Sequence, residues 1–288
     1  MAVADPWILE AAKRPATLTP PRLSKRLTSG RFIVVALGVV SLVVLLLPLL
    51  APYSPTDPVG AGLLPPLSHG HLLGTDDIGR DLLSRILYGI RSSWFGTIAV
   101  LASALVIGTF IGVIAGLAGG VLDAALMRFS EIFLAMPAQV LAICLVAALG
   151  PSYIHVLIAV AVVWWPAYAR LIRTGVRSVK VRPHVEAARL ADISSARLAA
   201  RHILPGVLGP PLVLASVDIG TVLLVLSGLS LIGLGAPAPA PELGAMVSEG
   251  FPFLLQAWWV PLIPGFAITV IVLIGMVLGD IMRGRIST

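Results

Sequence analysis

Charged residues are scarce in this sequence. Only 12% of its 288 residues are Asp, Glu, Lys or Arg, 58% are hydrophobic, and the mean hydropathy is +0.99. Soluble domains usually hold about 25% charged residues. The deficit excludes an ordinary water-soluble domain and, together with long apolar runs, places the chain in the membrane class.

Cysteine, clustered metal ligands and phosphate-binding loops are missing too. Cys144 is the single cysteine, so neither an internal disulfide nor a cysteine-based metal cluster is expected. His69 and His71 form an H-G-H pair without a third ligand, which is a weak signal for a metal. No stretch matches G-x-x-x-x-G-K-[ST], so if ATP drives the protein, the ATPase is a separate chain. We expect this chain to hold no metal, no cofactor and no catalytic residue.

Positive charge is in modest excess, and its distribution carries information. The net charge is +6 and the sequence pI is near 10.1, which could suggest nucleic acid. The basic residues instead cluster at the ends of apolar runs, as signals of membrane topology do. We therefore expect a lipid bilayer as partner and no nucleic acid.

Six apolar runs are candidates to cross a bilayer, which takes about 20 helical residues. They lie at residues 32–50, 94–117, 132–149, 153–169, 212–234 and 260–278. The first run is too long for a cleaved signal peptide, whose apolar region holds about 7–15 residues. The predicted fold is all-α: a polytopic membrane protein with six transmembrane helices in one domain, residues 32–288, after a basic leader at 1–31.

The basic residues also predict the orientation. Of the 20 Lys and Arg, six precede the first run, eight lie between the fourth and fifth runs, and two are in the C-terminal tail. The positive-inside rule puts these sixteen in the cytoplasm. Both termini are then cytoplasmic, and the loop with Glu242 and Glu249 is external.

One polar segment, "EAARLADISSARLAARHILP" at 186–205, interrupts the apolar pattern. Its three arginines and two acids would cost roughly 10 kcal/mol at the bilayer centre, so it lies outside the hydrocarbon. Alanine, leucine and arginine favour helix. We predict a helix at 185–191, a turn at Asp192, and a helix at 194–202 whose N-terminus Asp192 caps. From the residues alone, a solvated helix without a partner fits equally well.

A second segment, "HLLGTDDIGRDLLSRILYGIRSS" at 71–93, lies between the first two runs. Ile78, Leu82, Ile86 and Ile90 recur at helical spacing with charged residues interleaved, which predicts an amphipathic helix capped by Thr75 or Asp76. An interfacial helix leading into the second span accounts for the same pattern.

Few acids fall within or beside the apolar runs. Asp218 lies about two turns into the fifth run, where it is a candidate for the translocation path or sits near the cytoplasmic interface. Asp123 and Glu131 flank Arg128 at helical spacing, which predicts an internal set of ion pairs.

The polar segment resembles the coupling motif of bacterial ATP-binding-cassette importer permeases: E-A-A, three residues, a turn, nine residues, then I-x-L-P. Here Glu186-Ala187-Ala188 and the turn at Asp192 are present, but the x is absent, because the chain reads His202-Ile203-Leu204-Pro205. The usual spelling R-H-I-L-P matches Arg201 to Pro205. The family has glycine at the turn, whereas this chain has Asp192. The resemblance implies that residues 184–205, which we call the coupling segment, dock in a groove of the ATPase. Glu186 would make polar contacts within the segment or to the ATPase.

Three further strings resemble the dipeptide, oligopeptide and nickel subfamily of these permeases. They are "LGTDDIGRDLLSRILYG" with Gly74, Thr75, Asp76, Asp77, Gly79, Arg80 and Asp81, then "GGVLDAALMR" at 119–128 and "LSLIGLGAPAPAPELGAMVSEG" at 229–250. Leu243 stands where the family usually has an aromatic residue.

The resemblance implies the type I importer permease fold, as the C-type subunit of a peptide importer in the bacterial inner membrane. Its expected partners are a second homologous permease, two ATPase subunits or domains that bind ATP and Mg, and an extracytoplasmic binding protein. Cargo other than peptide, such as nickel, is the alternative within the subfamily.

Two other classes compete with an importer permease. A membrane hydrolase could use Ser230 in Gly228-Leu229-Ser230 with His155, but such strings are common by chance and no orienting acid is evident. An ion-coupled secondary carrier would show an internal repeat and more intramembrane charge than this chain has.

Overall fold

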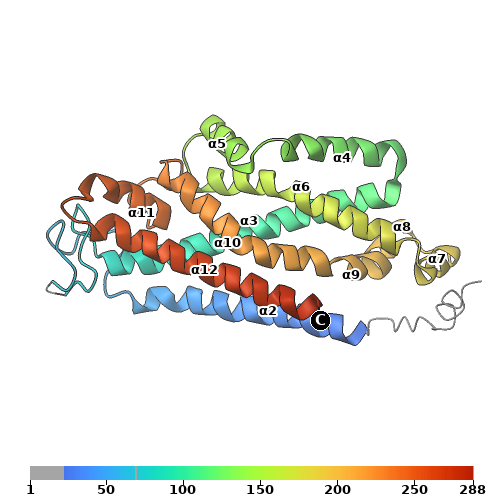
Figure 1. Ribbon diagram of the computed structural model, residues 1–288, viewed down its shortest axis with the longest axis horizontal. Coiled ribbons are helices and arrows are strands. Elements are labelled where there is room, and N and C mark those ends of the chain that lie inside the picture. Colours follow the sequence, from blue (N-terminus) through green and yellow to red (C-terminus); the bar gives the residue numbers. More distant parts are fainter. Residues whose placement is uncertain (1–22, 69, 288) are drawn as a thin grey trace, which may run out of the picture.

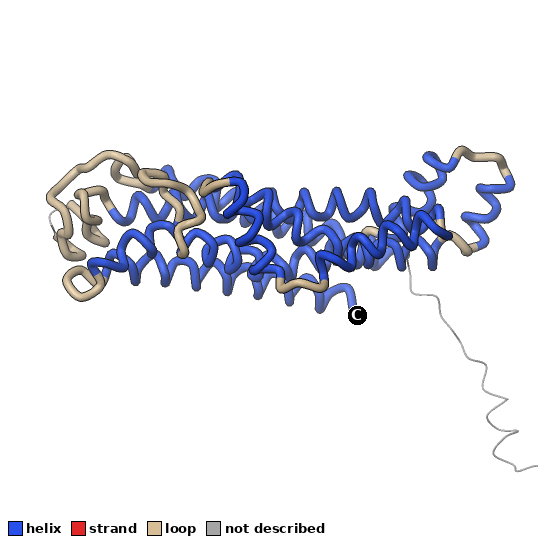
Figure 2. Tube along the Cα trace, turned by 90° about the horizontal axis from the view of Figure 1, so that it is seen from above, coloured by secondary structure: helices blue, strands red, loops and turns tan. Residues whose placement is uncertain are grey.

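The computed structural model describes residues 23–68 and 70–287, which form an elongated bundle of helices (Figures 1 and 2). No strand occurs among these residues. The elements in chain order are α2 Leu23–Leu46, η1 Leu47–Leu50, α3 Leu82–Ala118, α4 Gly120–Leu134, α5 Ala138–Leu149, α6 Tyr153–Val179, α7 Pro183–Leu190, α8 Ser195–Leu198, η2 Ala199–Ile203, α9 Leu204–Val207, α10 Gly209–Leu231, α11 Leu243–Gly250, η3 Phe251–Phe253 and α12 Trp259–Ser287. The all-α prediction is confirmed.

The count of six membrane helices is not exact. In the described part of the chain, four helices are long and apolar enough to cross a membrane: α3, α6, α10 and residues Trp259–Ile281 of α12. Residues Val35–Leu50 form a shorter apolar helix. Of the predicted leader 1–31, residues 1–22 lie outside the described residues, and α2 begins at Leu23.

The predicted third span, 132–149, is broken. α4 ends at Leu134, α5 begins at Ala138, and the two helices are bent by 89°. Pro137 stands between them, and a proline disfavours helical backbone at the residue before it, here Met136. Hydropathy alone does not register this break, because the residues from Leu134 to Ala138 are all apolar.

The helices α3 and α6 make the most extensive contact in the bundle. Gly108, Gly112 and Gly116 recur every fourth residue of α3 and therefore share one face. A Cβ atom at any of them would collide with α6, for example with Tyr168 at Gly108 and with Val176 at Gly116. Glycine allows membrane helices to approach this closely.

The bundle has two distinct ends (Figure 1). At the loop end, the chain from Ala51 to Asp81 packs beside α11. At the opposite coupling end, α7 and α8 project from the bundle, as Figure 2 also shows. The start of α2 and the end of α12 both point toward the coupling end (Figure 1).

Candidate functional site

The coupling segment contains the predicted turn at Asp192. The φ of Asp192 is +55°, in the left-handed region. The Asp192 N–H donates to the Arg189 carbonyl at 3.1 Å, and the Ile193 N–H donates to the Ala188 carbonyl at 3.4 Å. These two bonds are those of a Schellman motif, which ends a helix on a left-handed residue. Aspartate tolerates that conformation better than most residues, which explains how it replaces the family's glycine.

The second half of the segment differs from the prediction. Instead of one helix at 194–202, α8 is followed by the π-helix η2 and then by α9. The N-cap of α8 is Ser194, with no side-chain cap, so the predicted capping by Asp192 is wrong. Pro205 has no N–H with which to continue regular α-helical bonding, and the wider turn of η2 precedes it.

A small hydrophobic cluster fixes the coupling segment to the bundle. Val185, Leu198 and Ile203 are buried against Ile172 and Val176, near the end of α6. The segment is therefore joined to α6 by packed apolar side chains.

The remaining motif residues divide between the root and the surface of the segment. Ala188 is buried in the cluster and Leu204 packs against it. The exposed positions are Glu186, Ala187, Asp192, Arg201 and Pro205. Leu190, at the end of α7, is 85% exposed.

At the loop end, residues 74–81 form what we call the signature loop. The predicted helix exists from Leu82 onward, but its predicted start near Ile78 and its predicted cap at Thr75 or Asp76 are wrong, because α3 starts at Leu82 and its N-cap is Asp81. The Asp81 carboxylate accepts from the Ser84 N–H at 2.8 Å and the Ser84 hydroxyl at 2.7 Å. Gly79 has a φ of +86°, and a Cβ there would collide with the Gly60 carbonyl oxygen. The Asp81 cap and the left-handed backbone at Gly79 both prevent α3 from beginning before Leu82.

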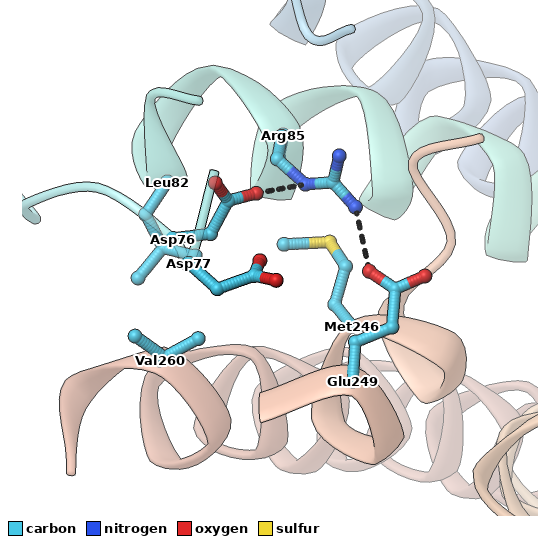
Figure 3. Close-up of a pocket in the computed structure, with 7 residues that line it drawn as sticks. All are labelled: Asp76, Asp77, Leu82, Arg85, Met246, Glu249 and Val260. Atoms are coloured by element: carbon cyan, nitrogen blue, oxygen red, sulfur yellow. Dashed lines mark hydrogen bonds and ion pairs between the residues drawn. The ribbon is translucent and has the colours of Figure 1, made fainter. Parts of the chain in front are cut away.

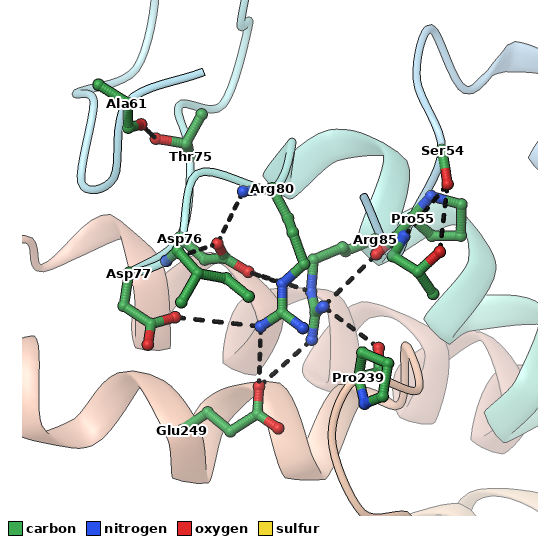
Figure 4. Close-up of polar contacts among 12 residues, drawn as sticks. Ser54, Pro55, Ala61, Thr75, Asp76, Asp77, Arg80, Arg85, Pro239 and Glu249 are labelled. Carbon is green, nitrogen blue, oxygen red and sulfur yellow. Dashed lines mark hydrogen bonds and ion pairs between the residues drawn. The ribbon is translucent and has the colours of Figure 1, made fainter. Parts of the chain in front are cut away.

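Four charged side chains join the signature loop to α11. In Figure 3, Arg85 lies between Asp76 and Glu249. Its Nη2 is 3.3 Å from Glu249 Oε2, and its Nε is 3.5 Å from Asp76 Oδ2. Arg80 Nε donates to Asp76 Oδ2 at 2.6 Å, and Arg80 Nη2 is 3.5 Å from Glu249 (Figure 4). We call Asp76, Arg80, Arg85 and Glu249 the charge network.

The other signature residues are structural as well. The Thr75 hydroxyl donates to the Ala61 carbonyl at 2.7 Å and accepts from the Leu64 N–H at 2.9 Å. His71 Nδ1 is 2.9 Å from Asp81, whereas His69 lies outside the described residues. Gly74 is buried, and Asp77 is exposed at 3.9 Å from Arg80. The signature loop is therefore an internally bonded part of the fold that is buried except at Asp77 and Ile78.

Two carboxyl groups at the loop end, those of Glu249 and Glu242, have a raised pKa. Burial raises the pKa of Glu249, and Arg85 and Arg80 offset part of that shift. Burial also raises the pKa of Glu242, although its carboxylate accepts from the Ala245 and Gly244 N–H groups at the start of α11. An open depression of about 370 Å³ lies beside Glu249, Arg80 and Pro239.

The acids near the apolar runs have partners that the sequence did not identify. Asp123 pairs with Arg173 and Arg177 of α6, so the prediction that it joins Arg128 is wrong, whereas Arg128 does pair with Glu131 at 3.7 Å. Asp218 accepts hydrogen bonds from Tyr168 and Trp164. The coupling segment, the signature loop and Asp218 lie in three separate places in the structure, so these predicted site residues do not form one site.

Comparison with known families identifies the chain. Residues 108–288 match the family described as "Binding-protein-dependent transport system inner membrane component". The chain belongs to this family. It is therefore a multi-pass membrane component of a transport system, and its role is transport, not catalysis.

Curated relatives extend this match to the N-terminal part of the permease. The dipeptide transport system permease protein DppC of Haemophilus influenzae is 40% identical over 255 residues, covering 86% of this chain and 86% of that protein. The probable D,D-dipeptide transport system permease protein DdpC of Escherichia coli is 41% identical over 244 residues, covering 83% and 82%.

Solved structures confirm the predicted importer permease fold. An amino acid ABC transporter with histidines has a TM-score of 0.53 at 17% identity, covering 70% of this permease and 94% of that chain. The MetNI methionine ABC transporter, in an inward-facing form, has a TM-score of 0.52 at 18% identity, covering 69% and 95%.

Sequence reasoning missed Arg85 and Glu249 as partners. Arg85 is one of the charged residues interleaved in the amphipathic pattern at 78–90, which predicts a place on the polar face, yet it is 1% exposed. The available signal was that both residues lie in strings shared with the subfamily.

Proposed function

We propose that the chain is the permease subunit of an ATP-driven importer of dipeptides and oligopeptides. It forms half of the translocation pathway, with a second homologous permease forming the other half. Two ATPase subunits or domains bind ATP and Mg, and an extracytoplasmic binding protein delivers cargo. The names of the curated relatives support peptide as the cargo.

The observation that carries the coupling role is the construction of the coupling segment. Its root is buried on α6 through Val185, Leu198 and Ile203, while Leu190 and Glu186 at its far side are exposed. A rigid root transmits displacement, and an exposed apolar tip suits a groove in another protein. We infer that the ATPase moves α6 through this segment.

The same proposal fixes the orientation. The coupling end faces the cytoplasm of a bacterium and both termini lie there, as the excess of Lys and Arg around the coupling segment favours. The loop end is then external, and the depression beside Glu249 faces the binding protein.

A matched pair of variants tests the coupling role. Leu190 and Leu67 are both highly exposed, 85% and 81%, but lie at opposite ends of the bundle. In the full complex reconstituted in proteoliposomes, we expect Leu190→Arg to reduce ATP-driven uptake of alanyl-alanine at least tenfold and to weaken co-purification with the ATPases. Leu67→Arg should leave ATPase association intact. Normal uptake and assembly of Leu190→Arg would overturn the coupling assignment.

The cargo needs its own measurement. The wild-type complex should take up alanyl-alanine in an ATP-dependent manner and should not take up nickel ions at a comparable rate. ATP-dependent nickel uptake without peptide uptake would replace the peptide assignment with the metal alternative.

A further inference from the structure

Asp218 is an acid placed deep in the bundle. It is the one charged residue of α10, and it lies about 14 Å along the helix from Gly209, at 1.5 Å per residue. A charge at that depth in a membrane costs about 2.5–3.5 kcal/mol on insertion scales. Such residues generally mark a pathway or a binding site.

Two aromatic side chains of α6 contact the Asp218 carboxylate. The Tyr168 hydroxyl donates to Oδ2 at 2.8 Å, and Trp164 Nε1 donates to the same oxygen at 3.3 Å. Trp164 and Tyr168 are four residues apart and therefore share one face of α6. Both hydrogen bonds come from neutral groups.

Asp218 differs in this respect from the buried acids that make ion pairs. Asp76 pairs with Arg80, Asp81 with His71, and Asp123 with Arg173. Among the side chains that the structure describes, those of residues 35–68, 70–281 and 283, none of Lys, Arg or His makes an ion pair with the Asp218 carboxylate. Its negative charge thus has no counter-cation in the described part of the chain.

The surroundings of the carboxylate are apolar and aromatic. Phe133, Trp164 and Leu214 pack against the buried Trp165 and Tyr168. Asp218 and Trp164 remain partly exposed, whereas Tyr168 is fully buried. A carboxylate beside the accessible part of an indole ring is the combination that attracts an organic ammonium group, by ion pairing and by cation–π interaction.

We propose that Asp218 and Trp164, with Tyr168 orienting the carboxylate, bind the terminal ammonium group of a peptide as it crosses the membrane. This inference rests on the proposed function and deepens it: the pathway selects cargo with a free, protonated amino terminus. The cargo supplies the counter-cation that Asp218 lacks, and α6, which carries Trp164, also carries the root of the coupling segment.

The test compares two cargoes in the reconstituted complex, each at a concentration that saturates the binding protein. Alanyl-alanine has the ammonium group and N-acetyl-alanyl-alanine lacks it. We expect Asp218→Asn, which still accepts the Tyr168 hydrogen bond, to slow alanyl-alanine uptake about tenfold and to leave the rate for the acetylated peptide at the wild-type value. Asp218→Glu should restore part of the alanyl-alanine rate. Asp280→Asn, which neutralises an exposed acid of α12, is the matched control and should transport both cargoes normally.

A second series of variants tests the role of the Trp164 indole ring, with alanyl-alanine as the only cargo. The uptake rate should fall in the order wild type, Trp164→Phe, Trp164→Leu, because phenylalanine retains an aromatic face and leucine does not.

Several results would overturn the ammonium site. They are normal alanyl-alanine uptake by Asp218→Asn, an equal loss for both cargoes, and loss of the assembled complex in that variant. Each of them leaves the proposed function standing as long as the wild type takes up alanyl-alanine. If the wild type takes up no peptide, the proposed function fails and the ammonium site fails with it.

Discussion

The two ends of the bundle use charged residues in opposite ways. At the loop end, Asp76, Arg80 and Arg85 are buried and paired with one another or with Glu249. In the coupling segment, Glu186, Arg189 and Asp192 are exposed, and the buried residues of the segment itself are apolar. Charge is therefore buried and paired around the signature loop, whereas the charges of the coupling segment lie at the surface.

The largest effect is expected from the charge network. Arg85→Met leaves Glu249 and Asp76 with less compensation in a buried site, and breaking such a pair by removing one partner typically costs about 3–5 kcal/mol. Thermal unfolding of the purified protein in detergent measures this. Arg91→Met, on the exposed face of the same helix, is the control and should change little. Equal melting temperatures for the two variants would mean that the network does not stabilise the loop end.

The coupling end should separate stability from function. Leu198 is buried at the root, and Leu198→Ala should cost about 2–5 kcal/mol. Leu190→Ala removes an exposed side chain and should change the unfolding free energy by no more than about 0.5 kcal/mol. Thermal unfolding gives the first quantity, and ATP-driven uptake should show that Leu190→Ala nevertheless impairs transport. A stability loss at Leu190 would show that its side chain is buried against the chain itself.

A smaller effect is expected at the turn of the coupling segment. Asp192→Gly relieves a left-handed residue and should stabilise the segment by about 1 kcal/mol while keeping transport. Uptake and thermal unfolding, measured on the same preparation, check both parts. If coupling is lost despite normal folding, the aspartate carboxylate contacts the partner.

The smallest effect is a pH dependence at the loop end. Because burial raises the pKa of Glu242 above its ordinary value of 4.5, the folded protein keeps a proton that the unfolded chain releases. Stability therefore falls as pH rises above 4.5. Glu242→Gln removes this pH-dependent contribution, so the stability of the variant relative to the wild type should rise as pH rises from 4.5 to neutral. The substitution also costs about 1 kcal/mol at every pH, because it weakens one hydrogen bond.

Melting temperatures of both proteins across that pH range test the Glu242 prediction. Glu249 has a pKa shifted in the same direction, so some pH dependence should persist in the variant. Parallel curves for the two proteins would contradict the prediction.

Local properties of the sequence determined the membrane class, most of the apolar helices, the position of residues 186–205 outside the hydrocarbon and the turn at Asp192. Hydropathy, insertion cost and helix propensity are sums over neighbouring residues, so they need no knowledge of the fold. The motif residues of the coupling segment were also assigned from sequence, because they lie within 20 positions of one another.

The tertiary structure decided which side chains meet. Arg85 and Glu249 are 164 positions apart, and Asp123 pairs with α6 and not with Arg128 on its own helix. The signature loop is not helical, because Gly79 must approach Gly60 closely and Asp81 caps α3. Likewise, only the packing of α6 against α10 places Trp164 and Tyr168 on Asp218. These pairings depend on how distant helices pack, which local patterns do not encode.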